Sequence, residues 1–356
     1  MDRAVLLRAL REPASMGELA PAQWDVLLRQ GRQVGALGRL AALAAGAGVL
    51  PAVPSRVRVR LEAALEDVEQ QHRLIRWEVI RLRRALAGTG LPLVLLKGAA
   101  YLHAGLPAAR GRQFSDVDIL VPRASLHEVE AALLREGWKM EALSAYDERY
   151  YREWSHELPP LAHPKRHVML DVHHNILPPT GRLRPDPRLL LEAAVPVTGD
   201  GLRVLGPADM VVHSACHLLQ SGEHDKSLRD LGDLDALMRQ FGAAPRFGDE
   251  LAARAAALDL ERPLFYALRF AARLFGTPIP EATARAVRRA APPALVRAAM
   301  DRLFAAAVEP GPPQDPPRRT RLARAILTVR YHWLRMPPSL LARHLAHKIG
   351  GRRGRG

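Results

Sequence analysis

Two aspartates, separated by a single residue, begin a short apolar run. The run S-D-V-D-I-L-V covers residues 115–121, so Asp116 and Asp118 alternate with Val117 and Ile119. Because successive side chains of a strand point to opposite faces, both carboxylates share one face. Two neighbouring carboxylates repel each other unless a divalent cation neutralises them, and Mg²⁺ prefers such hard oxygen ligands. The pair indicates a candidate Mg²⁺ site, and the alternative is a solvated strand end.

A third aspartate interrupts the apolar run of residues 168–172. An isolated carboxylate inside such a strand is costly to bury unless it is paired or bound to a metal. Asp171 is therefore a good candidate for a third metal ligand. His173 lies two residues further along, on the same face of the predicted strand. A histidine in that place needs no function, and we interpret it as a strand-end or core residue.

A lysine and a glycine close another apolar run, L-P-L-V-L-L-K-G at residues 91–98. Lysine is rare here, with five lysines among 52 cationic residues. Lys97 could place a compact ammonium against a phosphate, and Gly98 could leave the backbone open to close approach by a ligand. Shortly before the acids, Arg112 and Ser115 offer a guanidinium and a hydroxyl to the same site. The alternative for Lys97 is a strand-end lysine without a ligand.

Hydrophobic periodicity predicts the elements that position these residues. Residues 55–86 carry apolar side chains mostly at three- or four-residue steps, which predicts an amphipathic helix. The short apolar runs with the lysine and the acids are typical of buried strands, and residues 124–136 have helical spacing. A further short strand is predicted at 203–206, and from Pro207 onward the spacing is helical again.

These patterns predict an α/β (α+β) chain in which a small sheet domain lies between helical regions. Its 356 residues are enough for two or three domains. The expected boundaries are an N-terminal helical region at 1–88, the sheet domain at 89–205, a C-terminal helical region at 206–309, and a Pro-rich linker with a basic tail at 310–356.

The net charge of +15 is concentrated at the C-terminus. Residues 318–356 hold eleven Lys or Arg and no Asp or Glu, so most of the excess lies there. Such a segment suits RNA or an anionic surface, which it would bind by counterion release. Its apolar residues equally suit amphipathic helices that dock on the body of the protein. We expect docking over 322–345 and a solvated end at 350–356.

The overall composition favours a folded cytoplasmic protein. Hydrophobic residues make up 48% and charged residues 25% of the chain, which excludes a disordered or collagen-like protein. The single cysteine, Cys216, excludes an internal disulfide and a Cys-based zinc site. No stretch reaches the roughly 18 apolar residues of a membrane span, so we expect no transmembrane segment.

Taken in order, these motifs resemble those of a known family. They are similar to the uncharacterised nucleotidyltransferase family of the DNA polymerase β-like superfamily, through V-L-L-K-G at 94–98, Arg112, S-D-V-D-I-L-V at 115–121 and H-V-M-L-D-V-H-H at 167–174. A later H-x-x-x-H helix and R-D-L-G-D-L-D-A-L at 229–237 add to the resemblance. It covers most of the chain, about residues 30 to 340.

The resemblance implies a small mixed sheet that binds two Mg²⁺ ions, with Mn²⁺ as a substitute, and transfers a nucleoside monophosphate from a nucleoside triphosphate. ATP is the donor we expect. By position, the catalytic and metal-binding residues would be Asp116, Asp118 and Asp171, and the nucleotide-binding residues Lys97, Gly98, Arg112 and Ser115. The glycine-serine pair of the wider superfamily is Lys97-Gly98 here, which leaves open how the triphosphate is held.

The acceptor stays open between a protein, an RNA, a sugar and a small molecule. An aminoglycoside-type or antitoxin-type adenylyltransferase would differ in its acceptor only. A rival from another class is a catalytically silent regulatory or nucleic-acid-binding protein with the same fold, whose basic tail supplies the affinity. The complete set of three aspartates argues against a silent protein.

Two further clusters are interpreted as structural. His213 and His217 lie four residues apart on one helical face, and no glutamate follows His213 as a metalloprotease motif requires. They suit helix packing or the lining of a cleft. The mixed charges of residues 226–235 suit surface ion pairs. Asp233 also matches a helix aspartate of the resembled family, which makes it a candidate cleft residue.

Overall fold

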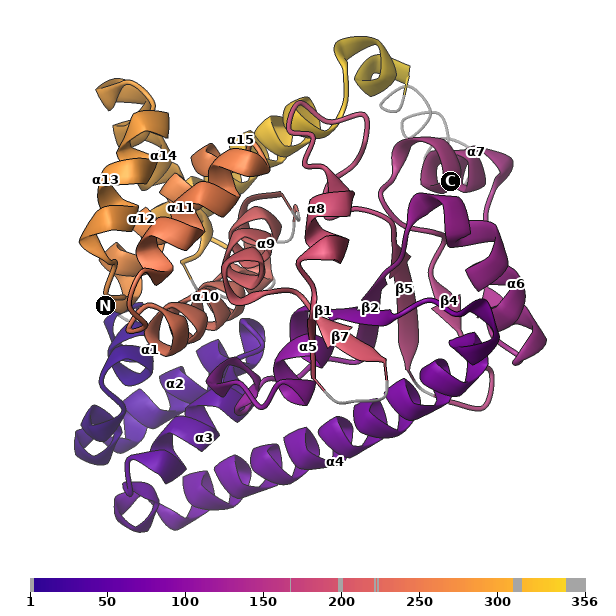
Figure 1. The fold of residues 1–356 in the computed structure, drawn as a ribbon. Helices are drawn as coiled ribbons and strands as arrows, with labels where there is room; N and C mark the ends of the chain where they lie inside the picture. Colours follow the sequence, from indigo (N-terminus) through magenta and orange to yellow (C-terminus); the bar gives the residue numbers. More distant parts are fainter. Residues whose placement is uncertain are drawn as a thin grey trace, which may run out of the picture.

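The structure is a computed structural model, shown as a ribbon in Figure 1. It describes residues 3–166, 168–197, 201–220, 222, 224–309 and 316–343. His167, most of the predicted Pro-rich linker and the predicted solvated end at 350–356 lie outside the described residues. In the described part of the chain, no helix has both the length and the apolar character of a membrane span.

A seven-stranded mixed sheet forms the centre of the protein, with the strand order β3-β4-β5-β2-β1-β7-β6. The strands are β1 (Leu93–Leu96), β2 (Asp116–Leu120), β3 (Lys139–Met140), β4 (Leu161–Ala162), β5 (Met169–His173), β6 (Val195–Pro196) and β7 (Leu202–Val204). Strand β1 runs antiparallel to β2 and parallel to β7, and β2 runs parallel to β5. The predicted α/β (α+β) class and the mixed sheet are confirmed.

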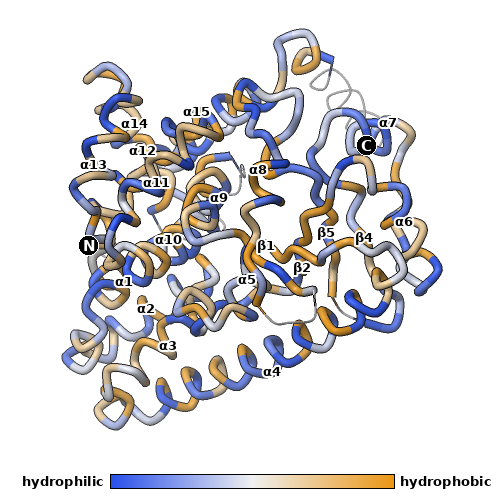
Figure 2. The backbone as a smooth tube through the Cα atoms, in the orientation of Figure 1, coloured by the Kyte–Doolittle hydropathy of each residue, from blue (hydrophilic) through white to orange (hydrophobic). Residues whose placement is uncertain are grey.

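The register of the central strands brings the predicted acids together. Asp118 of β2 pairs with Asp171 of β5, and on its other side it pairs with Leu96, the last residue of β1. Val117 and Ile119, which alternate with the acids, are fully buried on the opposite face. Hydrophobic colour is concentrated along β1 and β5 in Figure 2. The carboxylates therefore project from a strand whose other face is anchored in the core.

The N-terminal region consists of helices, as predicted. They are α1 (Arg3–Arg11), α2 (Pro21–Gln33), α3 (Leu37–Gly46) and α4 (Ser55–Leu86). Helix α4 has the predicted limits and lies along the sheet domain and α3 (Figure 1). One stripe of α4, which includes Leu61, Ile75 and Leu82, is fully buried. Its outer side carries many charged residues together with four exposed apolar ones, Val59, Leu74, Trp77 and Ile80. Burial of the apolar stripe fixes the helix against the rest of the fold.

Short helices connect the strands of the sheet domain. They are α5 (Lys97–His103), α6 (Leu126–Arg135), α7 (Ala145–Arg149) and α8 (Pro187–Glu192). The prediction that Lys97 and Gly98 end a strand was wrong, because β1 stops at Leu96 and Lys97 begins α5. Lys97 has a φ of 47°, a left-handed conformation that is uncommon for a residue other than glycine.

Helices fill the C-terminal region, as predicted. They are α9 (Pro207–Gln220), α10 (Ser227–Phe241), α11 (Phe247–Ala257), α12 (Glu261–Phe275), α13 (Glu281–Val287), α14 (Ala294–Ala307) and α15 (Arg318–Arg335). Helix α9 packs against α10, α11 and α12. Helix α15 packs against α14 and α9 and buries Ala323 and Leu327, so the predicted docking is confirmed in the described part of the tail.

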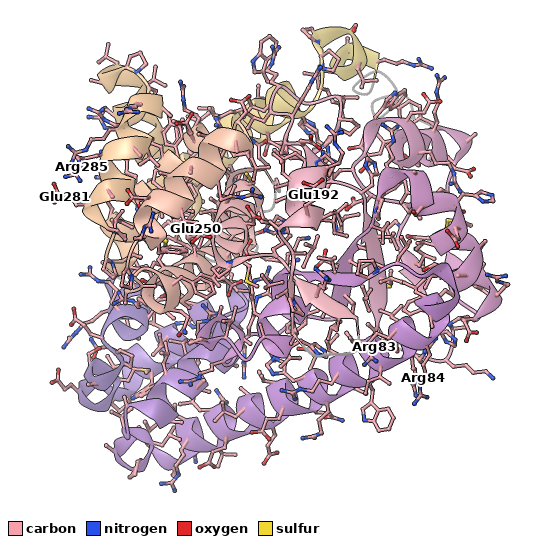
Figure 3. The ribbon with its side chains drawn as sticks, viewed as in Figure 1. Arg83, Arg84, Glu192, Glu250, Glu281 and Arg285 are labelled. Atoms are coloured by element: carbon pink, nitrogen blue, oxygen red, sulfur yellow. The ribbon has the colours of Figure 1, made fainter. Side chains whose placement is uncertain are left out.

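Exposed charges cover the outer helices. Glu281 and Arg285 form an ion pair one turn apart on α13, at the edge of the molecule in Figure 3, and Arg83 and Arg84 lie beside the last turn of α4. Such exposed pairs contribute little to stability. The buried ion pairs of Asp233 matter more, because breaking one would leave an uncompensated charge shielded from water.

Asp233 of α10 joins the helical regions to the sheet domain. Its two carboxylate oxygens accept hydrogen bonds from Arg39 Nη2 at 2.5 Å and from Arg112 Nε at 2.7 Å. Arg39 also donates to the carbonyl of Ala108. The prediction of surface ion pairs was wrong for Asp230 and Asp233, which are 4% and 3% exposed. Asp230 pairs with the adjacent Arg229 in the interior. The partners of Asp233 were invisible in the local charge pattern because Arg112 and Arg39 lie 121 and 194 residues away.

Replacing Asp233 with asparagine should leave two buried guanidinium groups without a counter-charge. We expect Asp233→Asn to lower the free energy of unfolding by about 3–5 kcal/mol, the usual cost of breaking a buried ion pair. Urea unfolding followed by circular dichroism measures this loss. The control is Asp25→Asn on the exposed side of α2, which should change stability by less than about 0.5 kcal/mol. Equal stability of the two variants would contradict the role of the network.

Candidate functional site

The carboxylate of Asp118 lies at the centre of the candidate site. Its side chain is buried, with 2% of the residue exposed. Lys97 Nζ donates to its Oδ1 at 2.7 Å, and His173 Nε2 lies 2.9 Å from the same oxygen. Burial alone would raise the pKa of Asp118, but the two cationic neighbours outweigh burial and hold this pKa well below its ordinary value. Asp118 is therefore an anion in the folded protein.

The charge of Asp118 raises the pKa of both of its partners. Burial alone would lower the pKa of Lys97, yet the charge of Asp118 raises it. Burial would likewise lower the pKa of His173, and the hydrogen bond to Asp118 with the charge of Glu157 raises it instead. His173 Nδ1 lies 3.4 Å from Glu157 Oε2 without forming a hydrogen bond, so the ring lies between two carboxylates. His173 was interpreted from the sequence as a residue without function, but it contacts the central acid.

Asp171 differs from Asp118 because no cation compensates its charge directly. Among the described residues, no side chain forms a hydrogen bond or an ion pair with its carboxylate. Burial, followed by the nearby charge of Asp118, raises the pKa of Asp171 above its ordinary value. A half-buried carboxylate that lacks a cation beside an anionic neighbour is the arrangement that a divalent ion stabilises.

The donor groups present fit a hard divalent cation. Ligand atoms of Asp118, Asp171 and His173 lie within 4.8 Å of one another, and His173 shares a second such group with His156 and Glu157. Carboxylate oxygens are the preferred ligands of Mg²⁺, and both ions of interest, Mg²⁺ and Mn²⁺, accept oxygen donors. Asp116 faces the same side of β2 two residues earlier but is outside these close groups. The predicted acids share one site, and Asp116 stands at its rim.

A cavity of about 500 Å³ opens over the acids. It is bounded by residues from the sheet domain and from both helical regions, namely Gly35, Gln71, Lys97, Arg112, Gln113, Phe114, Ser115, Asp116, Asp118, His156, Glu157, Asp171, His173, Ile176, Leu177, Pro178, His217, Gln220, Lys226, Arg229 and Arg335. Every predicted site residue except Gly98 is on this wall. The volume lies within the range of small-molecule sites.

Two of the predicted nucleotide-binding residues have clear packing roles. Gly98 is buried away from the cavity wall, and a Cβ there would lie 2.3 Å from Arg112 Nη1 and 2.8 Å from the ring of Phe114. Glycine is therefore required for close packing of α5. Arg112 lies over the rings of Tyr101 and Phe114, and its Nε is bound to Asp233. Arg112 therefore lines the cavity while its Nε is held by Asp233.

The structure adds residues to the site that sequence reasoning missed. His156 and Glu157 precede β4 and join β5 through a backbone bridge between Glu157 and His173. Gln71 of α4 accepts a hydrogen bond from the backbone of Phe114. Arg335 comes from α15, which the sequence analysis treated only as a docked or free tail. These residues belong to no local motif, because tertiary contacts alone bring them to the acids.

The histidines of α9 line or support the cavity, as predicted. His217 is on the wall, with Nδ1 3.3 Å from Asp230 Oδ2. His213 is buried beneath it, and burial holds its pKa well below the ordinary value. Burial also raises the pKa of the Cys216 thiol. Neither His213 nor Cys216 belongs to a candidate metal group among the described residues.

A family comparison agrees with this geometry. A family model described as an uncharacterised nucleotidyltransferase matches residues 20–276, which is more than half of the chain. The chain belongs to this nucleotidyltransferase family. No curated protein matches it. The resemblance to the uncharacterised nucleotidyltransferase family is thus confirmed, and membership supports a transferase that binds a nucleotide.

The matched region of the nucleotidyltransferase includes the sheet, α4 and the helices from α9 to α12, and it ends just after α12. Enzymes of this kind usually use divalent metals, and the group of Asp118, Asp171 and His173 is a candidate for holding one. Helix α15 follows the matched region, although its last residue is on the cavity wall.

The raised pKa of Asp171 predicts the pH dependence of stability in the metal-free nucleotidyltransferase. The folded protein binds the proton of the Asp171 carboxyl group more tightly than the unfolded chain does. Protonation of Asp171 therefore stabilises the fold, and this stabilisation is complete at low pH. The effect is lost as pH rises from the ordinary aspartate value through the raised pKa. Asp171→Asn should therefore be more stable than the parent at pH 8, by about 1 kcal/mol or more, and should gain nothing at pH 4.

Thermal unfolding in EDTA from pH 4 to pH 9 measures this difference, with Asp25→Asn as the control. Added Mn²⁺ should raise the melting temperature of the parent and leave that of Asp171→Asn unchanged. Parallel pH curves for the parent and Asp171→Asn would show that the carboxylate is not destabilised by its surroundings.

Proposed function

We propose that this protein is a Mg²⁺-dependent nucleotidyltransferase that moves a nucleoside monophosphate from a nucleoside triphosphate, with ATP as the expected donor, to an acceptor. The supporting observation is the pairing of Asp118 with Asp171 on neighbouring strands, where only Asp118 has a cationic partner. The family match supports the same class of reaction.

Asp116, Asp118 and Asp171 would hold the metal ions. When bound, Mg²⁺ would neutralise the acids and stabilise the attacking and leaving oxygens of an in-line displacement. Asp171 lies beside Asp118 on the neighbouring strand and would accept the proton of the attacking hydroxyl. A bond then forms between the acceptor oxygen and the α-phosphorus, and the bond to the leaving pyrophosphate breaks.

Lys97 would neutralise Asp118 in the resting enzyme and donate to a phosphate oxygen when the substrate is bound. Its Nζ is 2.7 Å from Asp118, and Lys97 is on the cavity wall, so the ammonium would be available to a phosphate bound in the cavity. Ser115 and Arg112 lie on the same wall and would contact the nucleotide beside it. Gly98 would assist indirectly, by letting Arg112 approach α5.

Replacing Asp116 with asparagine tests the proposed reaction with little risk to the fold, because Asp116 is half-exposed at the rim. Asp116→Asn should remove most metal-dependent turnover, a loss of a hundredfold or more, while the melting temperature stays within a few degrees of the parent. The assay incubates the protein with each α-labelled nucleoside triphosphate, Mg²⁺ or Mn²⁺ and a lysate of its host. Equal labelling by parent and variant would contradict the catalytic assignment, and absence of labelling by the parent would favour binding without turnover.

Lys97→Ala should weaken binding of the nucleoside triphosphate by about 1.5–3 kcal/mol, the contribution of a hydrogen bond to a charged oxygen. Calorimetric titration of ATP in the presence of Mg²⁺ measures the loss. Lys139→Ala, an exposed lysine on β3, is the control and should bind like the parent. If the affinity for ATP is unchanged in Lys97→Ala, Lys97 only compensates the charge of Asp118.

A further inference from the structure

The end of α15 brings an arginine to the nucleotidyltransferase cavity from outside the family-matched region. Helix α15 runs from α14 toward the sheet domain in Figure 1, and its last residue, Arg335, lies on the cavity wall with Asp118 and Asp171. The loop after β5 fixes this end, because Thr180 Oγ1 donates to the carbonyl of Arg335 at 3.0 Å and Arg182 N donates to that of Leu334 at 2.8 Å.

Aromatic rings and hydroxyl groups, rather than a carboxylate, surround the guanidinium of Arg335. It lies 5.7 Å from the ring centre of Tyr150 and 5.5 Å from that of Tyr331, donates to the Tyr331 hydroxyl, and is 3.5 Å from Ser155 Oγ. Its Nε is buried and has no hydrogen-bond partner in the described structure. No acid of the described residues lies within ion-pair distance of the guanidinium, although the charge of Glu157 is among the causes that raise its pKa.

A half-buried guanidinium with a buried, unpartnered Nε and no ion pair is costly, and an anionic ligand in the cavity would offset that cost. A planar guanidinium binds the two oxygens of a phosphate or carboxylate group with two parallel hydrogen bonds. The unpartnered Nε and the opening of the cavity therefore indicate an oxyanion as the ligand of Arg335.

The order of the strands places this oxyanion apart from Lys97. Lys97 follows β1, the acids are on β2 and β5, and residues 155–158 join β5 on its other edge, where Leu158 N donates to the carbonyl of Val172. Arg335 contacts Ser155 of that segment. Lys97 and Arg335 thus flank the acids from opposite sides, and Arg335 lies on the side of Asp171.

We propose that Arg335 binds an oxyanion group of the acceptor, either a phosphate or a carboxylate, close to the hydroxyl that attacks the nucleotide. This inference rests on the proposed function, which assigns the triphosphate to Lys97 and the acceptor proton to Asp171. It narrows the open list of acceptors to anionic molecules. It also makes α15 a specificity element added to the part of the chain that the family shares.

The test titrates inorganic phosphate, and separately acetate, into the full chain saturated with Mg²⁺ and a non-hydrolysable ATP analogue. Calorimetry gives the affinity for each probe and for the analogue. Arg335→Gln should weaken the binding of phosphate or acetate at least tenfold and leave the affinity for the analogue within twofold. A preference for phosphate over acetate distinguishes the two kinds of acceptor. The control, Arg318→Gln at the exposed start of α15, should change neither affinity.

Arg335→Lys keeps the charge without the two-pronged geometry and should recover only part of the affinity, with a melting temperature equal to that of the parent. Unchanged phosphate and acetate affinity in Arg335→Gln would overturn the proposal, as would absence of binding of either probe to the parent. Loss of analogue affinity in Arg335→Gln would overturn it in favour of a nucleotide contact. If the analogue does not bind the parent, the proposed function fails, while titration of the nucleotide-free protein still tests the oxyanion site.

Discussion

Burial of one carboxylate is the constraint on which the site depends. Asp118 is anionic in the interior of the sheet, so its charge must be compensated by groups that the fold holds in place. Lys97 at the start of α5 and His173 on β5 supply this compensation from the two strands that flank β2. The left-handed backbone of Lys97 lies where the chain turns from β1 into α5, at the residue whose ammonium contacts Asp118.

A second buried carboxylate holds the walls of the cavity together. Asp233 of α10 binds Arg39 of the N-terminal helices and Arg112 of the sheet domain, so three regions of the chain meet at one side chain. Helices α9 and α10 then cover the acids with His217 and Arg229, and α15 closes the cavity with Arg335. The site is thus assembled from segments that are remote in sequence. The ion pairs of Asp118 and Asp233 hold these segments in position relative to one another.

The sequence predicted what local patterns encode. Helical periodicity placed 55–86 correctly, and the alternation around Asp116 and Asp118 placed both on one strand face. The three two-residue strands were too short to leave a pattern. Asp233 was misjudged because its arginines are distant in the chain, and Glu157 and Arg335 were missed because only tertiary packing brings them to the acids.

The most direct test of the account is a crystal structure with Mn²⁺ and a non-hydrolysable ATP analogue, because anomalous scattering locates the metal. The account predicts Mn²⁺ bound to oxygens of Asp118 and Asp171, with Lys97 Nζ moved from Asp118 to a phosphate oxygen. The triphosphate should lie on the α5 side of the acids. A structure in which Lys97 keeps its bond to Asp118 while the metal and the nucleotide bind elsewhere would contradict it.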